Sequence, residues 1–311
     1  MSPDVIATPR SQALLLPSGR RLGIAEQGDP HGVPILFFHG FVGSRLQCPP
    51  DGTMASTLGV RLIAVDRPGI GLSDPAPGRR LLDWAHDIKM LAEVLDLSRF
   101  ALLGWSAGAP HALVCAALLS QQVVALGLTS PMGGWFVGPG ATRHISKESQ
   151  GMTTLVRFAP WVLRPVFKLL QWRMVHNPQR LVENALTELP ARDQATLTNP
   201  AMRRMLIETS SEAFRRGVDG VYEDTLAVAR PWGFAPEAIE TPVWLWQGDA
   251  DTSVLPALAE ELAHKLPHCQ MTLLPGEGHF LLFTHWHTIL QTLALTFQET
   301  PAPKPGSLPS R

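Results

Sequence analysis

Short apolar segments that alternate with helical ones constrain the fold of this chain more than any other feature. Four of them in the first half are apolar on almost every residue, namely Pro34–Phe38, Arg61–Val65, Phe100–Leu103 and Val123–Leu128. Strands that are apolar on both faces are typical of a parallel sheet covered by helices on both sides. We therefore predict an α/β fold, with any chemistry at the carboxyl ends of its strands.

The neighbouring segments support this interpretation. Leu81 to Leu97 and Ala112–Leu119 have the apolar spacing of buried or half-buried helices. Ahead of the first apolar strand, Ala13–Leu16 and Arg21–Glu26 flank a Pro-Ser-Gly turn, a pattern that predicts a β-hairpin.

The pattern changes over residues 134–238, where helical periodicity continues without a convincing strand. Alternation then resumes with a strand at Pro242–Trp246, a helix at Leu255–Leu266, a strand at Gln270–Leu274 and a helix from about Thr284 to Phe297. We predict one core made of residues 11–133 and 239–298, interrupted by a helical cap of residues 134–238. The Pro- and Ser-rich residues 299–311 are predicted to be a disordered tail.

Composition limits the partners and the compartment. The formal net charge of −1 offers no basic surface for nucleic acid, and no run of about 18 uncharged apolar residues predicts a membrane span. Cys48, Cys115 and Cys269 are widely spaced and form no CxxC pair, which argues against a disulfide framework. With no signal-like N-terminus, we predict a cytoplasmic protein acting on a small molecule. The oligomeric state stays open.

The pentapeptide Gly104-Trp105-Ser106-Ala107-Gly108 matches G-x-S-x-G. In this motif a strained turn between a strand and a helix exposes the serine, and both neighbours are predicted here. Small residues flank the serine because bulk would clash at such a turn, and the N-terminus of the helix favours developing negative charge. The motif predicts Ser106 as a nucleophile.

A serine hydroxyl needs an adjacent base. Among eleven histidines, His279 is the best placed, because it lies in a glycine-rich loop directly after the last predicted strand. His111 lies inside a predicted helix and His39 in the loop after the first parallel strand, so we interpret both as structural. His285 and His287 have no accompanying carboxylate or cysteine cluster, and we predict no metal site.

The base in turn needs a carboxylate that orients it. Asp249 and Asp251 both follow the strand Pro242–Trp246, and Asp251, beyond the turn at Gly248, suits the role better. The segment after Val123–Leu128 contains no carboxylate that could replace it. The resulting chain order of serine, aspartate and histidine is the one found in G-x-S-x-G hydrolases.

Acyl transfer also needs N–H donors for the oxyanion. One should be the backbone N–H of Ala107, which follows the nucleophile. The second should be the N–H of Phe41, because Gly40 lets the loop after Pro34–Phe38 come close.

With these pieces in place, the chain resembles the α/β-hydrolase superfamily, in the cap-bearing branch of esterases, carbon–carbon bond hydrolases, dehalogenases and epoxide hydrolases. The matching segments are His39-Gly40-Phe41, Asp66–Ser73, Gly104–Gly108, Gly248–Pro256 and Gly278-His279, and the resemblance covers about Leu14 to Phe297. It implies an eight-stranded, mostly parallel sheet, a covalent acyl-enzyme and no cofactor. It also implies that Asp66–Asp74 shapes one side of the site, although a plain turn would explain that segment.

The sequence departs from that of two groups of relatives, and each departure argues against one kind of activity. Dehalogenases and epoxide hydrolases of this superfamily have an aspartate where this chain has Ser106. Prolyl aminopeptidases usually differ around the nucleophile. Both departures favour a carboxylesterase over these relatives.

The predicted cap bears on the substrate. From Leu155 to Met174, aromatic and aliphatic residues are mixed with Arg and Lys, which fits an apolar lid, plain packing on the core, or contact with a membrane surface. Arg215 and Arg216 could hold a substrate carboxylate but are more typical of solvated residues, and Tyr222 is expected to pack.

We therefore expect a serine hydrolase acting on carboxylic esters of small or hydrophobic acyl groups. The same triad would also serve a carbon–carbon bond hydrolase, an acyltransferase or a cofactor-free peroxidase. A noncatalytic ligand-binding relative is the third alternative, but its usual mark is a broken triad.

Overall fold

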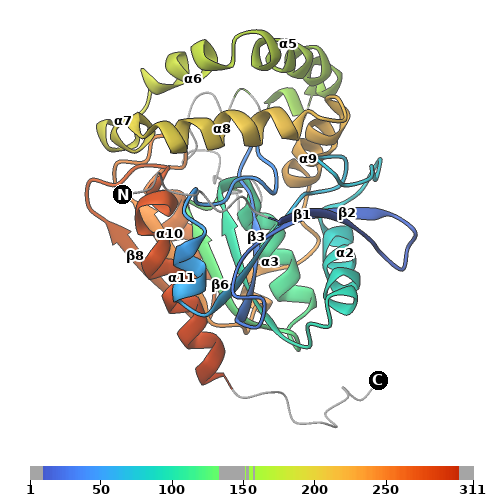
Figure 1. Ribbon diagram of the computed structural model, residues 1–311, viewed down its shortest axis with the longest axis vertical. Helices are drawn as coiled ribbons and strands as arrows, with labels where there is room; N and C mark the ends of the chain where they lie inside the picture. The colour runs from blue at the N-terminus through green and yellow to red at the C-terminus, as the bar shows by residue number, and fades with distance from the viewer. Residues whose placement is uncertain (1–9, 133–150, 152–153, 157, 301–311) are drawn as a thin grey trace.

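Eight strands form one sheet in the computed structural model, which describes residues 10–132, 151, 154–156 and 158–300 (Figure 1). The strands are β1 (Arg10–Leu15), β2 (Arg21–Gly28), β3 (Val33–Phe38), β4 (Val60–Val65), β5 (Phe100–Trp105), β6 (Val123–Thr129), β7 (Val243–Gly248) and β8 (Cys269–Leu274). Their order is β1-β2-β4-β3-β5-β6-β7-β8, with antiparallel pairs at β1–β2 and β2–β4 and parallel pairs elsewhere. The α/β-hydrolase fold and the N-terminal hairpin are thereby confirmed.

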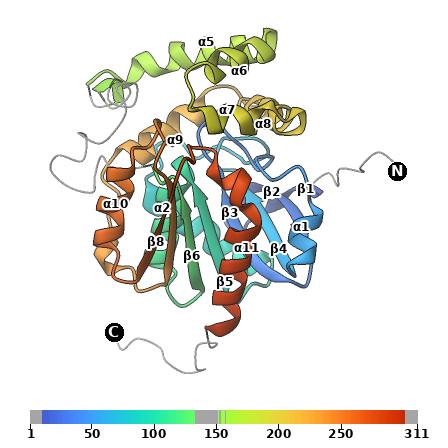
Figure 2. The same cartoon turned by 90° about the vertical axis from the view of Figure 1, so that its left-hand side faces the viewer.

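Helices cover both faces of the sheet, as Figure 2 shows. On one face lie α2 (Leu81–Val94), α3 (Ala109–Leu118) and α10 (Pro256–Lys265), and on the other lie α1 (Thr53–Thr57) and α11 (Leu281–Glu299). Strand β3 has no polar side because a helix packs against each of its faces. Phe38 packs edge-on against Trp84 of α2, and its neighbour Phe37 packs edge-on against Trp286 of α11.

Further helices follow β6 in the described part of residues 134–238, before β7. They are α5 (Leu163–His176), α6 (Pro178–Leu186), α7 (Ala191–Thr198), α8 (Pro200–Ala213) and α9 (Asp219–Ala229), with the short turns η4 (Pro160–Val162) and η5 (Pro236–Ala238) at either end. Helices α5 to α8 form a layer across one end of the strands, above the sheet as Figures 1 and 2 show it. In the described part of residues 134–238 there is no strand, in line with the predicted helical character. Residues 133–150, 152–153 and 157 lie outside the described residues.

Helix α9 approaches the core more closely than side-chain packing would allow. A Cβ atom on Gly220 would lie 2.0 Å from the carbonyl oxygen of Gly69, in the loop after β4. Gly69 has a φ of 81°, a conformation that disfavours other residues. Backbone therefore rests on backbone at this point.

Several boundaries differ by a few residues from those predicted. The last helix begins at Leu281 rather than Thr284 and continues through Glu299, one residue into the predicted tail. The helix after the serine begins at Ala109, with Pro110 in its first turn, where a missing N–H costs nothing. The predicted disorder of the remaining tail falls on residues 301–311, outside the described residues.

Candidate active site

Ser106 stands at the turn between β5 and the short η1 turn (Ser106–Gly108) that leads into α3. Its φ of 52° is left-handed, a strained conformation for a residue with a side chain. Gly108 makes this turn sterically feasible, since a Cβ there would lie 2.0 Å from the carbonyl oxygen of Phe38. The sequence motif thus corresponds to a sharp, crowded turn with the serine at its apex.

The structure brings Ser106, His279 and Asp251 together. Oγ of Ser106 lies 3.1 Å from Nε2 of His279, and Nδ1 of His279 lies 2.9 Å from Oδ2 of Asp251. All three residues are buried, with at most 9% of their surface exposed. Because a carboxylate only accepts hydrogen bonds, Nδ1 carries a proton and Nε2 is free to accept one from the serine.

The two candidate carboxylates have separate roles. Oδ1 of Asp251 accepts the N–H groups of Ser253 and Val254, at 2.8 and 2.9 Å, which directs Oδ2 to the histidine. Asp249 instead accepts the N–H of Gly276 at an exposed position and makes no contact with the histidine. Of the two carboxylates, Asp251 is the one within hydrogen-bonding distance of His279.

His279 and Asp251 shift each other's pKa in opposite directions. Burial would raise the pKa of Asp251, but the charge and hydrogen bond of His279 lower it below its usual value. Burial would lower the pKa of His279, but the charge and hydrogen bond of Asp251, together with the charge of Asp193, raise it above its usual 6.5. The site therefore favours the imidazolium that a base forms when it takes a proton.

The backbone of His279 is held as firmly as its ring. Nε1 of Trp105 donates to the carbonyl oxygen of His279 at 3.0 Å, and Oγ of Ser130 donates to the same oxygen at 3.4 Å. The rings of Trp105 and His279 lie 5.4 Å apart between centroids. Sequence reasoning did not assign Trp105 a function, although its place inside G-x-S-x-G was a signal.

The loop that carries Phe41 is fixed by two side chains. Oε1 of Gln47 accepts the N–H of Gly40 at 2.6 Å, and Nη1 of Arg67 donates to the carbonyl oxygen of His39 at 2.6 Å. The N–H of Phe41 itself makes no hydrogen bond to any other described residue. It is thus available to an oxyanion, as is expected of Ala107 in the first turn after the serine.

Arg67 belongs to a buried ion cluster that sequence reasoning missed. Its Nε lies 2.9 Å from both carboxylate oxygens of Asp224 on α9, and Nη2 of Arg79 lies 2.6 Å from Oδ1 of the same aspartate. Burial would raise the pKa of Asp224, but the positive charges around it lower that pKa well below its usual value. The segment Asp66–Asp74 is therefore more than a plain turn, since it ties α9 to the Phe41 loop.

The two histidines interpreted as structural are both buried in this region. Nδ1 of His39 lies 2.9 Å from the carbonyl oxygen of Gly40, and Nδ1 of His111 lies 3.0 Å from that of Ala107. Burial lowers the pKa of both, and most strongly that of His39, so each is neutral. Neither contacts Ser106 through a hydrogen bond.

A pocket of about 420 Å³ opens between the triad and helices α5 to α8. Its apolar lining includes Leu170, Met174, Leu181, Val182, Leu189, Leu197, Leu206, Phe214 and Phe280. Polar groups other than Ser106 and His279 come only from Gln47, Ser210 and Ser253 among the described residues, and no Asp, Glu, Lys or Arg lines it. The pocket is suited to an uncharged, largely apolar group.

The predicted lid segment has two apolar faces. Leu163 and Phe167 are buried against α9, and Met174 lines the pocket. Trp161 in η4 and Trp172 in α5 remain 66% and 53% exposed. Packing and pocket lining are thus combined in one segment.

The arginines weighed as substrate ligands have other partners. Arg215 pairs with Glu212, and Arg216 pairs with Asp74. Neither lines the pocket, so the structure does not support the carboxylate-binding alternative. Tyr222 is buried beneath the guanidinium of Arg164, 3.9 Å from the ring centre, which fits its expected packing role.

No group of three or more His, Cys, Asp or Glu side chains is assembled for a metal ion within the described ranges. His285 pairs with Glu277 instead. The three cysteines are free. None of the helices in the described part of the chain has the length and hydropathy needed to cross a bilayer.

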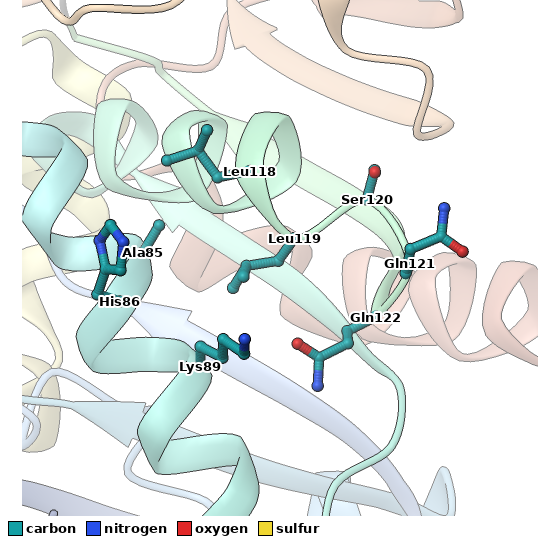
Figure 3. A pocket seen from close by; sticks show the side chains of 8 residues that line it. All are labelled: Ala85, His86, Lys89, Leu118, Leu119, Ser120, Gln121 and Gln122. Carbon is teal, nitrogen blue, oxygen red and sulfur yellow. The ribbon is translucent and has the colours of Figure 1, made fainter. Parts of the chain in front are cut away.

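A second hollow of about 510 Å³ lies between α2 and the C-terminal end of α3 (Figure 3). His86, Lys89 and Gln122 are among its lining residues. It lies at the end of α3 opposite Ser106, so its larger volume has no bearing on the triad.

Comparisons with known proteins agree with this geometry. A sequence model of the family described as "alpha/beta hydrolase fold" matches residues 33–285. The proline iminopeptidase of Neisseria gonorrhoeae is 29% identical over 104 residues, which are 32% of this chain and 33% of that protein. The non-heme chloroperoxidase of Streptomyces lividans is 33% identical over 91 residues, 29% of this chain and 33% of that protein. The matched stretch thus spans one third of the length of each relative.

Solved structures resemble most of the chain. A thermophilic esterase from Thermogutta terrifontis superposes with a TM-score of 0.65 at 20% identity, covering 93% of this chain and 98% of that one. A bromoperoxidase from Bacillus anthracis gives 0.66 at 17% identity, covering 93% and 100%. At such identities the likeness establishes the fold alone.

Proposed function

The chain belongs to the α/β-hydrolase fold family, and from this premise we propose that it is a serine hydrolase that cleaves carboxylic esters of small or hydrophobic acyl groups. One observation carries the proposal. An unbroken series of hydrogen-bonding contacts from Ser106 through His279 to Asp251 borders an apolar pocket. A noncatalytic relative would have no need of this arrangement.

The proposed first half-reaction transfers the acyl group to the enzyme. Oγ of Ser106 attacks the ester carbonyl carbon while Nε2 of His279 takes the hydroxyl proton, and Asp251 stabilises the resulting imidazolium. The carbonyl oxygen becomes an oxyanion, which the N–H groups of Phe41 and Ala107 stabilise. The C–O bond to the alcohol then breaks, and His279 returns its proton to the departing oxygen.

The second half-reaction uses the same groups with water. Neutral His279 takes a proton from a water molecule, whose oxygen attacks the acyl carbon. The bond to Oγ of Ser106 breaks, the serine regains its proton from His279, and the carboxylic acid leaves. Side chains and backbone N–H groups carry out every step of this scheme.

The lining of the pocket supports the substrate class. An aminopeptidase has to bind a substrate ammonium group, for which a carboxylate is the usual partner. Among the described residues no carboxylate lines the pocket, so that part of the lining offers no partner for an ammonium group. An acyl chain, in contrast, would gain from burial against leucine, methionine and phenylalanine side chains.

The proposal is tested by labelling with a fluorophosphonate probe and by turnover of p-nitrophenyl esters of increasing acyl length. We expect Ser106→Ala to abolish labelling and to lower kcat by roughly 10³-fold or more, because the nucleophile is gone. Ser120→Ala is the matched control, since Ser120 is an exposed serine in the second hollow. It should be labelled and active like the parent protein.

Each alternative has its own result. Labelling without ester turnover would retain the nucleophile and move the assignment to carbon–carbon bond hydrolysis or acyl transfer. Absence of labelling in the parent protein would refute a reactive serine altogether. The acyl length with the highest kcat/KM would measure the depth of the pocket.

A further inference from the structure

Helix α7 reaches from the helical layer down to the loop that carries His279. Oδ2 of Asp193, in the first turn of α7, accepts the N–H of His279 at 2.8 Å, and Oδ1 accepts the N–H of Phe280 at 3.0 Å. The aspartate is 1% exposed. Both of its oxygens are therefore committed to two consecutive N–H groups of one loop.

The loop is shaped to receive this carboxylate. A Cβ atom on Gly278 would lie 2.2 Å from Oδ2 of Asp193, so only glycine permits the approach. Next to Asp193, Arg192 pairs with Glu277 at 3.0 Å. Two adjacent residues of α7 thus hold the segment from Glu277 to Phe280.

The contact bears on the geometry of the base. Only two rotatable bonds separate the backbone of His279 from its ring, and Asp251 holds Nδ1 of that ring, so the position of the backbone helps to set where Nε2 meets Ser106. Trp105 fixes the carbonyl side of the same residue, at 3.0 Å from its oxygen. Asp193 fixes the N–H side of this residue by accepting its hydrogen bond.

The contact also places a second charge near the imidazole. The groups that face His279 are Asp251 from the loop after β7, Asp193 from α7 and the hydroxyl of Ser106. The charge of Asp193 raises the pKa of His279 and adds to the larger influence of Asp251, whereas burial lowers that pKa. Asp193 itself faces the charges of His279 and Asp251.

We propose that Asp193 is a positioning residue, supplied by the helical layer rather than by the core, that holds His279 against Ser106 and supports its imidazolium. This inference rests on the proposed serine hydrolase function. It assigns α7 a part in the rate of the chemical step, beyond the shape of the pocket. Docking of α7 onto the loop then becomes a condition for full activity.

The test uses Asp193→Asn in the full-length chain. An amide keeps the size of the side chain but presents an NH₂ group to one of the two N–H donors and removes the charge. We expect kcat to fall roughly 10- to 100-fold with KM nearly unchanged, the scale of a small misplacement of a catalytic group. The acid limb of the pH–rate profile should move to lower pH, because His279 loses a nearby negative charge.

Two further variants separate the contributions. Gly278→Ala pushes a methyl group into the carboxylate without changing any charge, so it should lower kcat while the acid limb stays near its original pH. Glu208→Gln is the control, since it removes an exposed carboxylate of α8 that pairs only with Arg204. It should leave both the rate and the profile unchanged.

A parent protein that the fluorophosphonate does not label would refute the hydrolase function itself. A labelled parent with an Asp193→Asn variant of equal kcat and an unmoved acid limb would overturn only the role of Asp193. An Asp193→Asn variant that loses activity with an unmoved acid limb would overturn the support of the imidazolium, because the charge of Asp193 would then have no effect on His279. Should Asp193→Asn fail to fold, an unchanged kcat in Gly278→Ala would overturn the positioning role.

Discussion

Asp224→Asn is expected to destabilise the protein far more than an ordinary surface substitution. Asp224 is 2% exposed and is the carboxylate between Arg67 and Arg79, whose side chains are 1% and 3% exposed. The amide would leave two buried guanidinium groups without their counter-charge. Removal of one partner from a buried ion pair costs about 3–5 kcal/mol of the free energy of unfolding, which lowers Tm by roughly 5–8 °C in a chain of 311 residues.

The matched control lies on the same helix. Asp219 also accepts from an arginine, Arg164 at 2.9 Å, but its side chain is 74% exposed. Asp219→Asn should therefore cost about 1 kcal/mol or less, because water screens an exposed pair. Thermal unfolding followed by circular dichroism, with urea titrations at equilibrium, would compare the two variants.

The pH of this comparison follows from the depressed pKa of Asp224. A lowered carboxylate pKa contributes stability that is present above the unfolded-state value of about 3.9 and is lost as pH falls through the folded-state value. Measurement at pH 7 thus records the full contribution. Equal loss of stability in Asp224→Asn and Asp219→Asn would refute the view that the buried cluster joins α9 to the core.

Two more predictions concern the triad. Neutral His279 is the proposed base, so activity should fall as pH decreases through the pKa of this histidine. Asp251 raises that pKa against the effect of burial, so the acid limb of kcat/KM should have its midpoint above 6.5. A rate that is constant down to about pH 4 would rule out a histidine base. Asp251→Asn should lower kcat by roughly 10⁴-fold, because Asp251 bonds the histidine. Asp249→Asn should change kcat less than about 10-fold, because Asp249 bonds the exposed loop at Gly276. The opposite order in steady-state kinetics would exchange the roles of the two aspartates.

Local sequence patterns were sufficient for the sheet and for the turn at Ser106. Strands such as Phe100–Trp105 are buried on both faces, and this burial requires the continuous apolar runs that the sequence displays. The turn at Ser106 needs small neighbours in a short stretch of chain, so the whole requirement is visible in five residues. The spacing from Gly248 also separated Asp251 from Asp249, because it reflects the length of one turn.

Contacts between distant segments left no such trace. Arg67 and Asp224 are 157 positions apart, and Asp193 and His279 are 86 apart. Arg67, Asp224 and Asp193 each resemble a solvated charge in their own neighbourhood, and only the fold shows that both pairs are buried. For this reason the local sequence of Asp66–Asp74 is explained by a plain turn as well as by a loop that shapes one side of the site.

The close approach of Gly220 to Gly69 has a consequence for protein engineering. A module exchanged between relatives over residues 134–238 would carry α9 away, and a foreign residue at position 220 would meet the carbonyl oxygen of Gly69. Gly217, between α8 and α9, has a φ of 92° and open space around its Cα. It is the natural joint for a chimera, because α9 belongs with the core in any graft, while a replacement for α5 to α8 has to keep an aspartate that accepts the N–H groups of His279 and Phe280.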